Sequence, residues 1–185
     1  MARAQIYFGK AVTADTGAAL VHAAKVIAME MTPQGAPAWD TIEVAIASGG
    51  GDIIAALGAY NELKRLPVKL HTHNSGAVDS AVILPFMLGE VRTASPMSGF
   101  FFHQVQWGFP AQSGLQTTLV NEASTLMEHY TDTVATIVSE RSKLAKNKVK
   151  SMMREGTLVL PERALEFGLI HRIEEPQIPQ RTWQV

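Results

Sequence analysis

The sequence predicts an α/β domain in which parallel strands are joined by helical crossovers. Short apolar segments rich in β-branched residues alternate with longer segments whose apolar residues recur at helical spacing, and such alternation favours a parallel sheet covered by helices. The chain has 185 residues, of which 46% are hydrophobic; this is enough for one well-buried domain and too little for two. Residues 115–155 contain neither Gly nor Pro, so we expect a long helix in the C-terminal half, followed by a shorter helix near 146–154.

Each of the other expected elements has its own local signal. The strands are bounded by turn residues and are expected at 5–9, 41–47, 67–73, 91–94, 99–104 and 169–173. The shorter helices show apolar residues at helical spacing and are expected at 13–28, 52–64, 81–88 and 161–168. Thr13 or Asp15 would cap the first of them. We expect a single domain over 1–174 and an extended tail over 175–185, since Pro176 and Pro179 disfavour a regular element there.

Ser80 is the most informative position in the chain. The polar, Gly-containing residues 74–79 are predicted to form a turn that lifts Ser80 out of a strand, and an apolar helical run follows directly. A hydroxyl at such a junction lies near a helix N-terminus, where free backbone N–H groups and the helix dipole stabilise developing negative charge. This environment suits a nucleophile, whereas the plainer interpretation of a serine at this kind of junction is a helix cap.

Two further segments flank Ser80 in the sequence. The run Ser48-Gly49-Gly50-Gly51 precedes it, and His103 follows the phenylalanines at 100–102. An imidazole titrates near neutral pH and can take a proton from a serine hydroxyl, and glycine backbone N–H groups can hold an oxyanion. The order therefore indicates acyl-transfer chemistry, the alternatives being an ordinary Gly-rich turn and a half-buried core histidine.

The composition argues against several classes of function. The formal net charge is −1, so neither nucleic acid nor a membrane is expected as a partner, and no apolar run approaches the ~20 residues of a membrane span. The absence of cysteine excludes a disulfide framework and suits the cytoplasm, as does a first strand that begins too early to leave room for a signal peptide. The glycine run lacks the lysine of a phosphate-binding loop, so no nucleotide cofactor is expected. His71 and His73 share one strand face without an evident third ligand, so we interpret them as structural and expect no metal.

Four motifs occur in a characteristic order along the chain. They are SGGGDI at 48–53, GAVDSA at 76–81, FFHQ at 101–104 and PERALEFGLI at 161–170. Taken together, these motifs mark a chain that resembles the ClpP-type serine peptidases from Ile6 to about Ile173. The resemblance implies a ClpP/crotonase-like fold of repeated strand-strand-helix units and assembly into stacked rings. It also implies that Ser80 is the nucleophile, His103 the general base, and Gly51 and Ala81 the backbone donors of the oxyanion hole.

The resemblance defines the third member of the implied catalytic triad less well. In the family, an acidic residue lies shortly before the helix that corresponds to 161–168. Counting back without a gap places Gly156 at this position, and a one-residue slip places Glu155 there. Three alternatives follow: Glu155 is the catalytic acid, the acid has been lost, or another group such as a backbone carbonyl orients His103.

Two aspartates also lie beside the motifs. Asp79 directly precedes Ser80, where the family usually has a small neutral residue, and its carboxylate would either point into solvent or disturb the oxyanion region by like-charge repulsion. Asp52 follows the glycine run, and we interpret it as a helix cap. The chain begins almost at its first strand, without the axial-pore segment usual in the family, so an unfoldase ATPase partner is implied by resemblance alone.

We therefore expect a cytoplasmic serine endopeptidase that hydrolyses unfolded polypeptides or peptides through a Ser-His dyad or triad in a homo-oligomeric ring. In such a ring the long helix would contact a symmetry partner; otherwise it would pack wholly on its own domain. Two other functions remain open: a catalytically silent ring subunit or scaffold, and an acyl-CoA-processing crotonase-like enzyme. A phage-type capsid-maturation or accessory peptidase would share the chemistry and differ only in its substrate.

Overall fold

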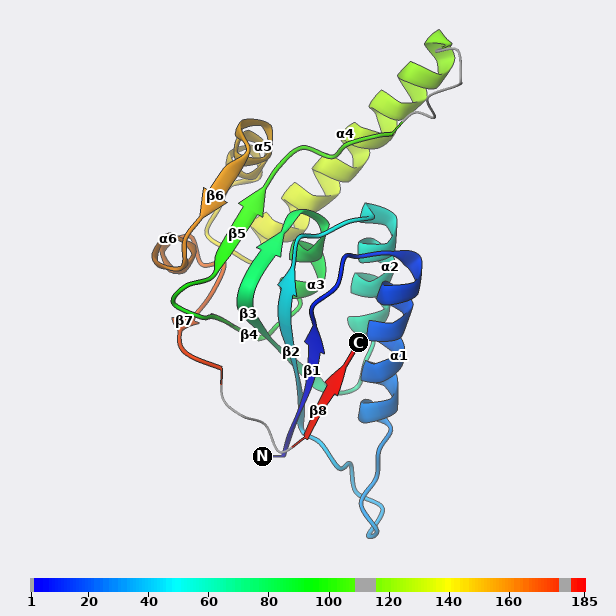
Figure 1. The fold of residues 1–185 in the computed structure, drawn as a ribbon, viewed down its shortest axis with the longest axis vertical. Helices are drawn as coiled ribbons and strands as arrows, with labels where there is room; N and C mark the ends of the chain where they lie inside the picture. Colours follow the sequence, from blue (N-terminus) through cyan, green and yellow to red (C-terminus); the bar gives the residue numbers. More distant parts are fainter. Residues whose placement is uncertain (1, 109–115, 177–180) are drawn as a thin grey trace.

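The computed structural model of the protein describes residues 2–108, 116–176 and 181–185, and these form a mixed α/β fold (Figure 1). The strands are β1 (Arg3–Phe8), β2 (Thr41–Ser48), β3 (Lys69–Asp79), β4 (Val91–Ala94), β5 (Gly99–Phe102), β6 (Thr157–Val159), β7 (Arg172–Ile173) and β8 (Arg181–Gln184). The helices are α1 (Ala14–Ala28), α2 (Ile53–Leu63), the 3-10 turn η1 (Ser80–Val82), α3 (Ile83–Phe86), α4 (Thr117–Glu140), α5 (Lys146–Glu155) and α6 (Pro161–Glu166). None of the helices in these ranges is long and apolar enough to cross a membrane.

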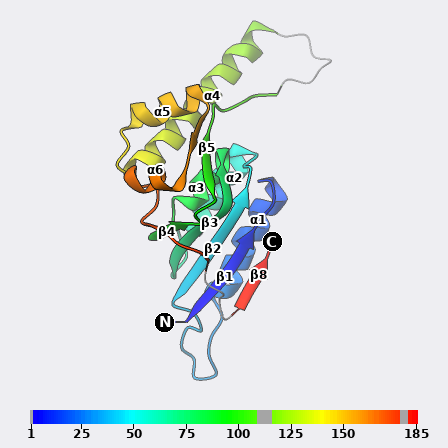
Figure 2. The ribbon, with the colours of Figure 1, turned by 60° about the vertical axis from the view of Figure 1, so that its left-hand side comes forward.

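The strands form one sheet in the order β6-β5-β3-β2-β1-β8, with β4 pairing β3 and β7 (Figure 2). The pairs β1–β2, β2–β3 and β3–β5 are parallel, as the alternation of strands and helices predicts. The long strand β3 pairs first with β4 and then, closer to its C-terminal end, with β5. Among the strands of the described residues, β6 alone runs antiparallel, against β5. The C-terminal ends of β2, β3 and β5 consequently come together at one side of the sheet.

Helices α1, α2, α4, α5 and α6 begin close to where the sequence predicts. Thr13 caps α1 in a capping box with Thr16, which confirms one of the two proposed caps. Helices α1 and α2 pack side by side against the sheet (Figure 1). The long Gly- and Pro-free segment gives α4 and α5, and α4 projects beyond the sheet at its N-terminal end (Figure 1). Its C-terminal half is buried through Val134 and Val138, so at least this half packs on its own domain.

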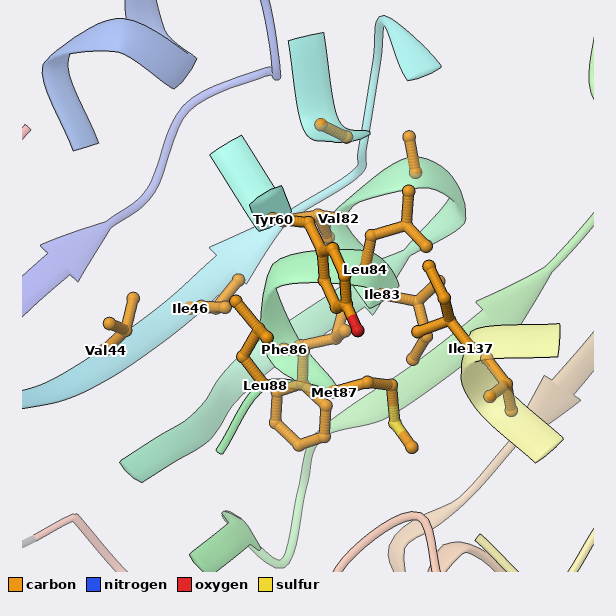
Figure 3. Close-up of a cluster of buried hydrophobic side chains, with 14 of the residues drawn as sticks. Val44, Ile46, Tyr60, Val82, Ile83, Leu84, Phe86, Met87, Leu88 and Ile137 are labelled. Atoms are coloured by element: carbon orange, nitrogen blue, oxygen red, sulfur yellow. The ribbon is translucent and has the colours of Figure 1, made fainter. Parts of the chain in front are cut away.

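The core lies between the sheet and helices α1 to α5, and Figure 3 shows the part of it that surrounds α3. Ile46 of β2, Phe86 of α3 and Ile137 of α4 are among its buried residues, together with Tyr60 of α2. Burying one such large side chain contributes roughly 1.5–3 kcal/mol. Because η1, which begins at Ser80, runs directly into α3, and α3 is buried along its whole length, the core fixes the position of the segment that carries this serine.

Three expectations about elements near Ser80 and His103 were wrong. Residues 74–79 were predicted to be a turn but belong to β3, because the Asn74 side chain donates to Gly99 O at 2.7 Å and accepts from the Gly76 N–H at 3.0 Å, which satisfies it within the sheet. The helix predicted at 81–88 is divided into η1 and the short α3. His103 was predicted on a strand but lies just after the end of β5.

The C-terminal part of the chain also differs from the expectation. The strand predicted at 169–173 is reduced to the two residues of β7. The short strand β6 has no counterpart among the predicted elements, because three residues are too few to show an alternating pattern. The tail predicted to be extended ends in β8, which pairs with β1, and Trp183 packs edge-on against Trp39 with 6.0 Å between ring centroids. Pro179 lies outside the described residues.

Candidate active site

The glycine run forms a fixed turn between β2 and α2. β2 ends at Ser48, whose hydroxyl donates to Lys10 O at 2.7 Å and accepts from the Gly50 N–H at 3.2 Å. Asp52 caps α2, its carboxylate accepting from the Ala55 N–H at 2.8 Å, which confirms its interpretation as a helix cap. Side-chain hydrogen bonds at both ends therefore hold the backbone of the turn.

Gly51 is held so that its own N–H points away from Val12. The Val12 N–H donates to Gly50 O at 2.8 Å, and the Asp52 N–H donates to Val12 O at 2.9 Å. In a parallel bridge of this kind the intervening residue directs its N–H and C=O to the opposite side. Gly51 has a φ of 146°, and a Cβ there would collide with Val12 O, so the position requires glycine.

Ser80 is strained. Its φ is 56°, and among the described residues it is the one non-glycine residue with a positive φ. This conformation costs about 1–2 kcal/mol and is typical of functional sites, where the surrounding structure enforces it. A Cβ on Gly50 would stand 2.5 Å from Asp79 O and 2.7 Å from Ser80 Cβ. The glycine turn therefore packs directly against the serine.

Ala81 provides a second backbone N–H beside Ser80. It is buried and belongs to the first turn of η1, where backbone N–H groups have no partner within the helix. Gly51, Ser80 and Ala81 line the same cavity. Two backbone N–H groups from separate elements thus border one serine, which is the arrangement that an oxyanion hole needs.

His103 lines the same cavity, in the segment that follows β5. Its Nδ1 lies 2.9 Å from the backbone carbonyl oxygen of Gln104. A carbonyl oxygen only accepts, so Nδ1 carries the proton and Nε2 is left as the acceptor. The imidazole also stacks on the ring of Phe101, with 5.7 Å between centroids and 30° between planes. The carbonyl and the ring together fix the tautomer and orientation of the base.

The cavity shared by these groups has a volume of about 510 Å³. Much of its remaining wall is apolar and comes from α2, β5, α4, α5 and the segment after His103: Ile53, Ile54, Phe102, Val105, Trp107, Val134 and Met153. No hydrogen bond joins Ser80 to His103 among the described residues, as is common in unliganded active sites. The cavity can receive an apolar side chain beside the serine.

The structure does not bring Glu155 to His103. Glu155 is exposed at the end of α5, and its carboxylate accepts a 2.5 Å hydrogen bond from Ser151 Oγ. Gly156 follows in a left-handed conformation with φ 65°. The antiparallel register ends where Phe102 pairs with Thr157, the first residue of β6. A Cβ on Gly156 would lie 3.8 Å from Phe101 Cζ, so a residue without a side chain lies beside the ring that stacks on His103.

Asp79 turns toward β5 instead of projecting into solvent. Its Oδ1 accepts the Phe101 N–H at 2.9 Å, and it makes no capping bond to η1 although it stands at the N-cap position. Burial raises the pKa of the Asp79 carboxyl, and the Phe101 N–H and the charge of His103 partly offset this rise. The carboxylate is thus held close to the histidine-bearing segment.

The His71–His73 pair lies away from this cavity. Both ring nitrogens of His73 are engaged, Nδ1 with Thr93 Oγ1 at 2.7 Å and Nε2 with Ser95 Oγ at 3.1 Å. Burial lowers the pKa of His73 and of His71. Within the described ranges, no group of three His, Cys, Asp or Glu residues could hold a metal ion.

Sequence reasoning missed several features of the site. It suggested a backbone carbonyl as one possible partner of His103 but did not identify Gln104, because a contact to the next residue depends on the conformation after β5. It likewise missed the bond from Phe101 to Asp79, which follows from the pairing of β3 with β5. The apolar wall at Val105 and Trp107 could have been noticed from the hydrophobic residues that follow His103.

A strained serine at the first turn of a helix, in a cavity that it shares with a histidine, is characteristic of hydrolases that use an activated serine. Here this arrangement is built on a parallel α/β sheet. A family model described as Clp protease matches residues 2–177. The chain therefore belongs to the Clp protease (ClpP) family, a family of serine peptidases, and its mixed α/β structure with the long helix α4 fits the ClpP/crotonase fold.

Proposed function

We propose that this protein is a serine endopeptidase that hydrolyses peptide bonds in unfolded polypeptides or peptides. The observation that carries the proposal is Ser80, held at φ 56° in a cavity that it shares with His103, Gly51 and Ala81. A strained serine needs support from its surroundings, and the glycine turn and the buried helix α3 supply it. A serine that only capped a helix would not need this conformation, because a cap residue normally adopts extended backbone angles.

The proposed reaction has two steps. Ser80 Oγ attacks the peptide carbonyl while its proton passes to Nε2 of His103, and the N–H groups of Gly51 and Ala81 hold the oxyanion. The amine then leaves with the proton from His103, which gives an acyl-enzyme. Water attacks the acyl-enzyme, His103 takes the proton of the water and returns one to Ser80, and the carboxylic acid is released.

In this mechanism the Gln104 carbonyl orients His103, because it already holds the Nδ1 proton. Glu155 is the alternative third member. To act in this role its carboxylate would have to leave Ser151 and turn toward the imidazole. Replacing Glu155 separates the two assignments, and the expected result is given in the Discussion.

Membership of the family supports peptide substrates and a ring of identical subunits. The projecting N-terminal part of α4 carries exposed Val120 and Leu126, which would become covered in a contact between copies. We extend the proposal to cytoplasmic proteolysis and to an unfoldase ATPase partner on family membership alone.

A fluorophosphonate, which phosphonylates activated serines, tests the proposal directly. Intact-protein mass should show a single adduct on the assembled parent protein and none on Ser80→Ala. His103→Ala should react at least about 1,000-fold more slowly, since the base is lost. Ser75→Ala, a change at another serine of β3, should behave like the parent.

A folded and assembled protein that forms no adduct would contradict the proposal. It would favour the catalytically silent ring subunit, for which the side-chain-free position at Gly156 is a specific argument.

A further inference from the structure

Asp79 has a conformation that its capping position does not explain. It stands at the N-cap of η1, where an aspartate normally accepts a helix N–H, yet its side chain makes no such bond. Its Oδ1 instead accepts the N–H of Phe101 at 2.9 Å. The side chain therefore continues the hydrogen bonding between β3 and β5 at the point where the backbone of β3 turns away into Ser80.

Phe101 links Asp79 to His103, because it contacts both residues. Asp79 and Phe101 are paired residues in the parallel register, so their side chains lie on one face of the sheet. The ring of Phe101 stacks on the imidazole of His103, on that same face. The carboxylate, the phenyl ring and the imidazole consequently follow one another along β5, and the carboxylate is fixed at the residue next to the nucleophile.

Placing a charged carboxylate at this partly buried position costs free energy. Burial disfavours the charged form of Asp79, and among the described residues His103 is the one ionisable group whose charge acts on it. Asp52 borders the same cavity from the N-terminus of α2, and Arg154 and Glu155 lie exposed at the end of α5. A negative charge close to an imidazole favours its protonated form, which is the form that His103 adopts when it takes the proton of Ser80.

We propose that Asp79 is a positioning residue for His103: its carboxylate holds β5 against the nucleophile turn and stabilises the positive charge that develops on the imidazole. This role rests on the proposed peptidase function. Asp79 supplies a carboxylate from the residue next to Ser80. Gly156, by contrast, has no side chain that could supply one.

Asp79→Asn separates charge from structure, because an amide oxygen can still accept the Phe101 N–H. Two measurements on the assembled protein are needed: the rate of fluorophosphonate labelling as a function of pH, and the titration of the His103 ring resonances by NMR, which does not depend on activity. Asp15→Asn, at an exposed aspartate in the first turn of α1, is the matched control. Asp79→Ala removes both the charge and the hydrogen bond.

The proposal predicts that Asp79→Asn labels about 10-fold more slowly at its pH plateau. The midpoints of both the labelling profile and the His103 titration should move to lower pH, since the positive charge has lost its partner. Asp15→Asn should change neither, and Asp79→Ala should be slower than Asp79→Asn.

Unchanged midpoints in Asp79→Asn, with a parent that labels normally, would overturn the role of Asp79 and leave the peptidase function intact. A shifted His103 titration in a protein that never labels would reject the peptidase function and retain the coupling between the two side chains.

Discussion

Two junctions of the chain adopt left-handed backbone conformations on either side of the candidate site, and they differ in what they carry. At the end of β3, Ser80 has φ 56° and presents a hydroxyl to the cavity. Between α5 and β6, Gly156 has φ 65° and presents no side chain, although it lies beside the Phe101 ring that stacks on His103. The first junction holds a side chain in a strained conformation, and the second has a glycine, which adopts the same conformation without strain.

The difference shows that the nucleophile side of the site is constrained more tightly than the acid side. Ser80 keeps its strained backbone conformation because the glycine turn packs against it and the buried helix α3 fixes the segment that follows it. At Gly156 the left-handed conformation is an ordinary helix C-cap. His103 is instead oriented by the Gln104 carbonyl and, as proposed, by the carboxylate of Asp79, which is bonded to Phe101.

The largest effect should come from disturbing the tightly constrained side. Gly51→Ala would introduce a Cβ into the Val12 oxygen and force the turn to move, so the oxyanion would lose one donor. Loss of one donor costs on the order of 100-fold or more in rate. We expect fluorophosphonate labelling or peptide hydrolysis to fall by at least that factor.

Gly58→Ala is the matched control for this change. It lies within α2, and an added Cβ there meets nothing within 4 Å. Replacing a helical glycine by alanine should stabilise the protein by roughly 0.5–1 kcal/mol and leave the rate unchanged. Equal rates for the two variants would show that Gly51 does not hold the oxyanion.

Adding a side chain on the acid side should have the opposite effect. In Gly156→Asp a carboxylate would stand beside the Phe101 ring, on which His103 stacks, and aspartate tolerates left-handed angles better than most residues. The new Cβ would lie 3.8 Å from Phe101 Cζ, so there is room for it. Because the loss of an orienting acid costs up to about 10,000-fold in one triad, partial recovery of about 10-fold in labelling rate is expected.

Gly156→Asn has the same shape without the charge and should show no gain. If both variants gained equally, packing at the junction, and not a third carboxylate, would be what limits the site.

The comparison of the two junctions also shows what the sequence could predict. Ser80 and the glycine run could be proposed as site residues because the proposal depends on residue type and local order, and the Asp52 cap depends on a single contact three residues along the chain. The α/β alternation and the long helix α4 likewise follow from periodicity alone.

The features that were missed depend on pairing between distant strands. Residues 74–79 contain turn-forming residues, but pairing of β3 with β2, β4 and β5 keeps them extended. The three residues of β6 are defined by their antiparallel partner β5, and the turn before β6 places Gly156 beside the Phe101 ring. The direction of the Asp79 side chain is fixed by the same sheet geometry, which a local pattern cannot show.

The burial of Asp79 should appear as a dependence of stability on pH. Its pKa is raised in the folded state, so Asp79 ionises at lower pH in the unfolded chain than in the folded protein. The free energy of unfolding therefore falls as the pH rises through this range, and the loss of stability remains at neutral pH. Asp79→Asn removes the penalty while keeping an acceptor for Phe101. Thermal unfolding should give a Tm about 2 °C above the parent at pH 7 and equal Tm values near pH 3; a lower Tm at pH 7 would mean that the charge itself stabilises the fold.

The smallest effect is expected at Glu155. Its carboxylate is exposed and bonded to Ser151 on the same helix, so Glu155→Gln should change the labelling rate by less than about twofold, within the range of surface substitutions. Glu162→Gln, at an exposed glutamate in the first turn of α6, provides the control. A loss of 10-fold or more in Glu155→Gln alone, with an unchanged Tm, would mean that Glu155 leaves Ser151 when substrate binds. The acid side would then be completed by a conformational change, and the contrast between the two junctions would describe only the unliganded state.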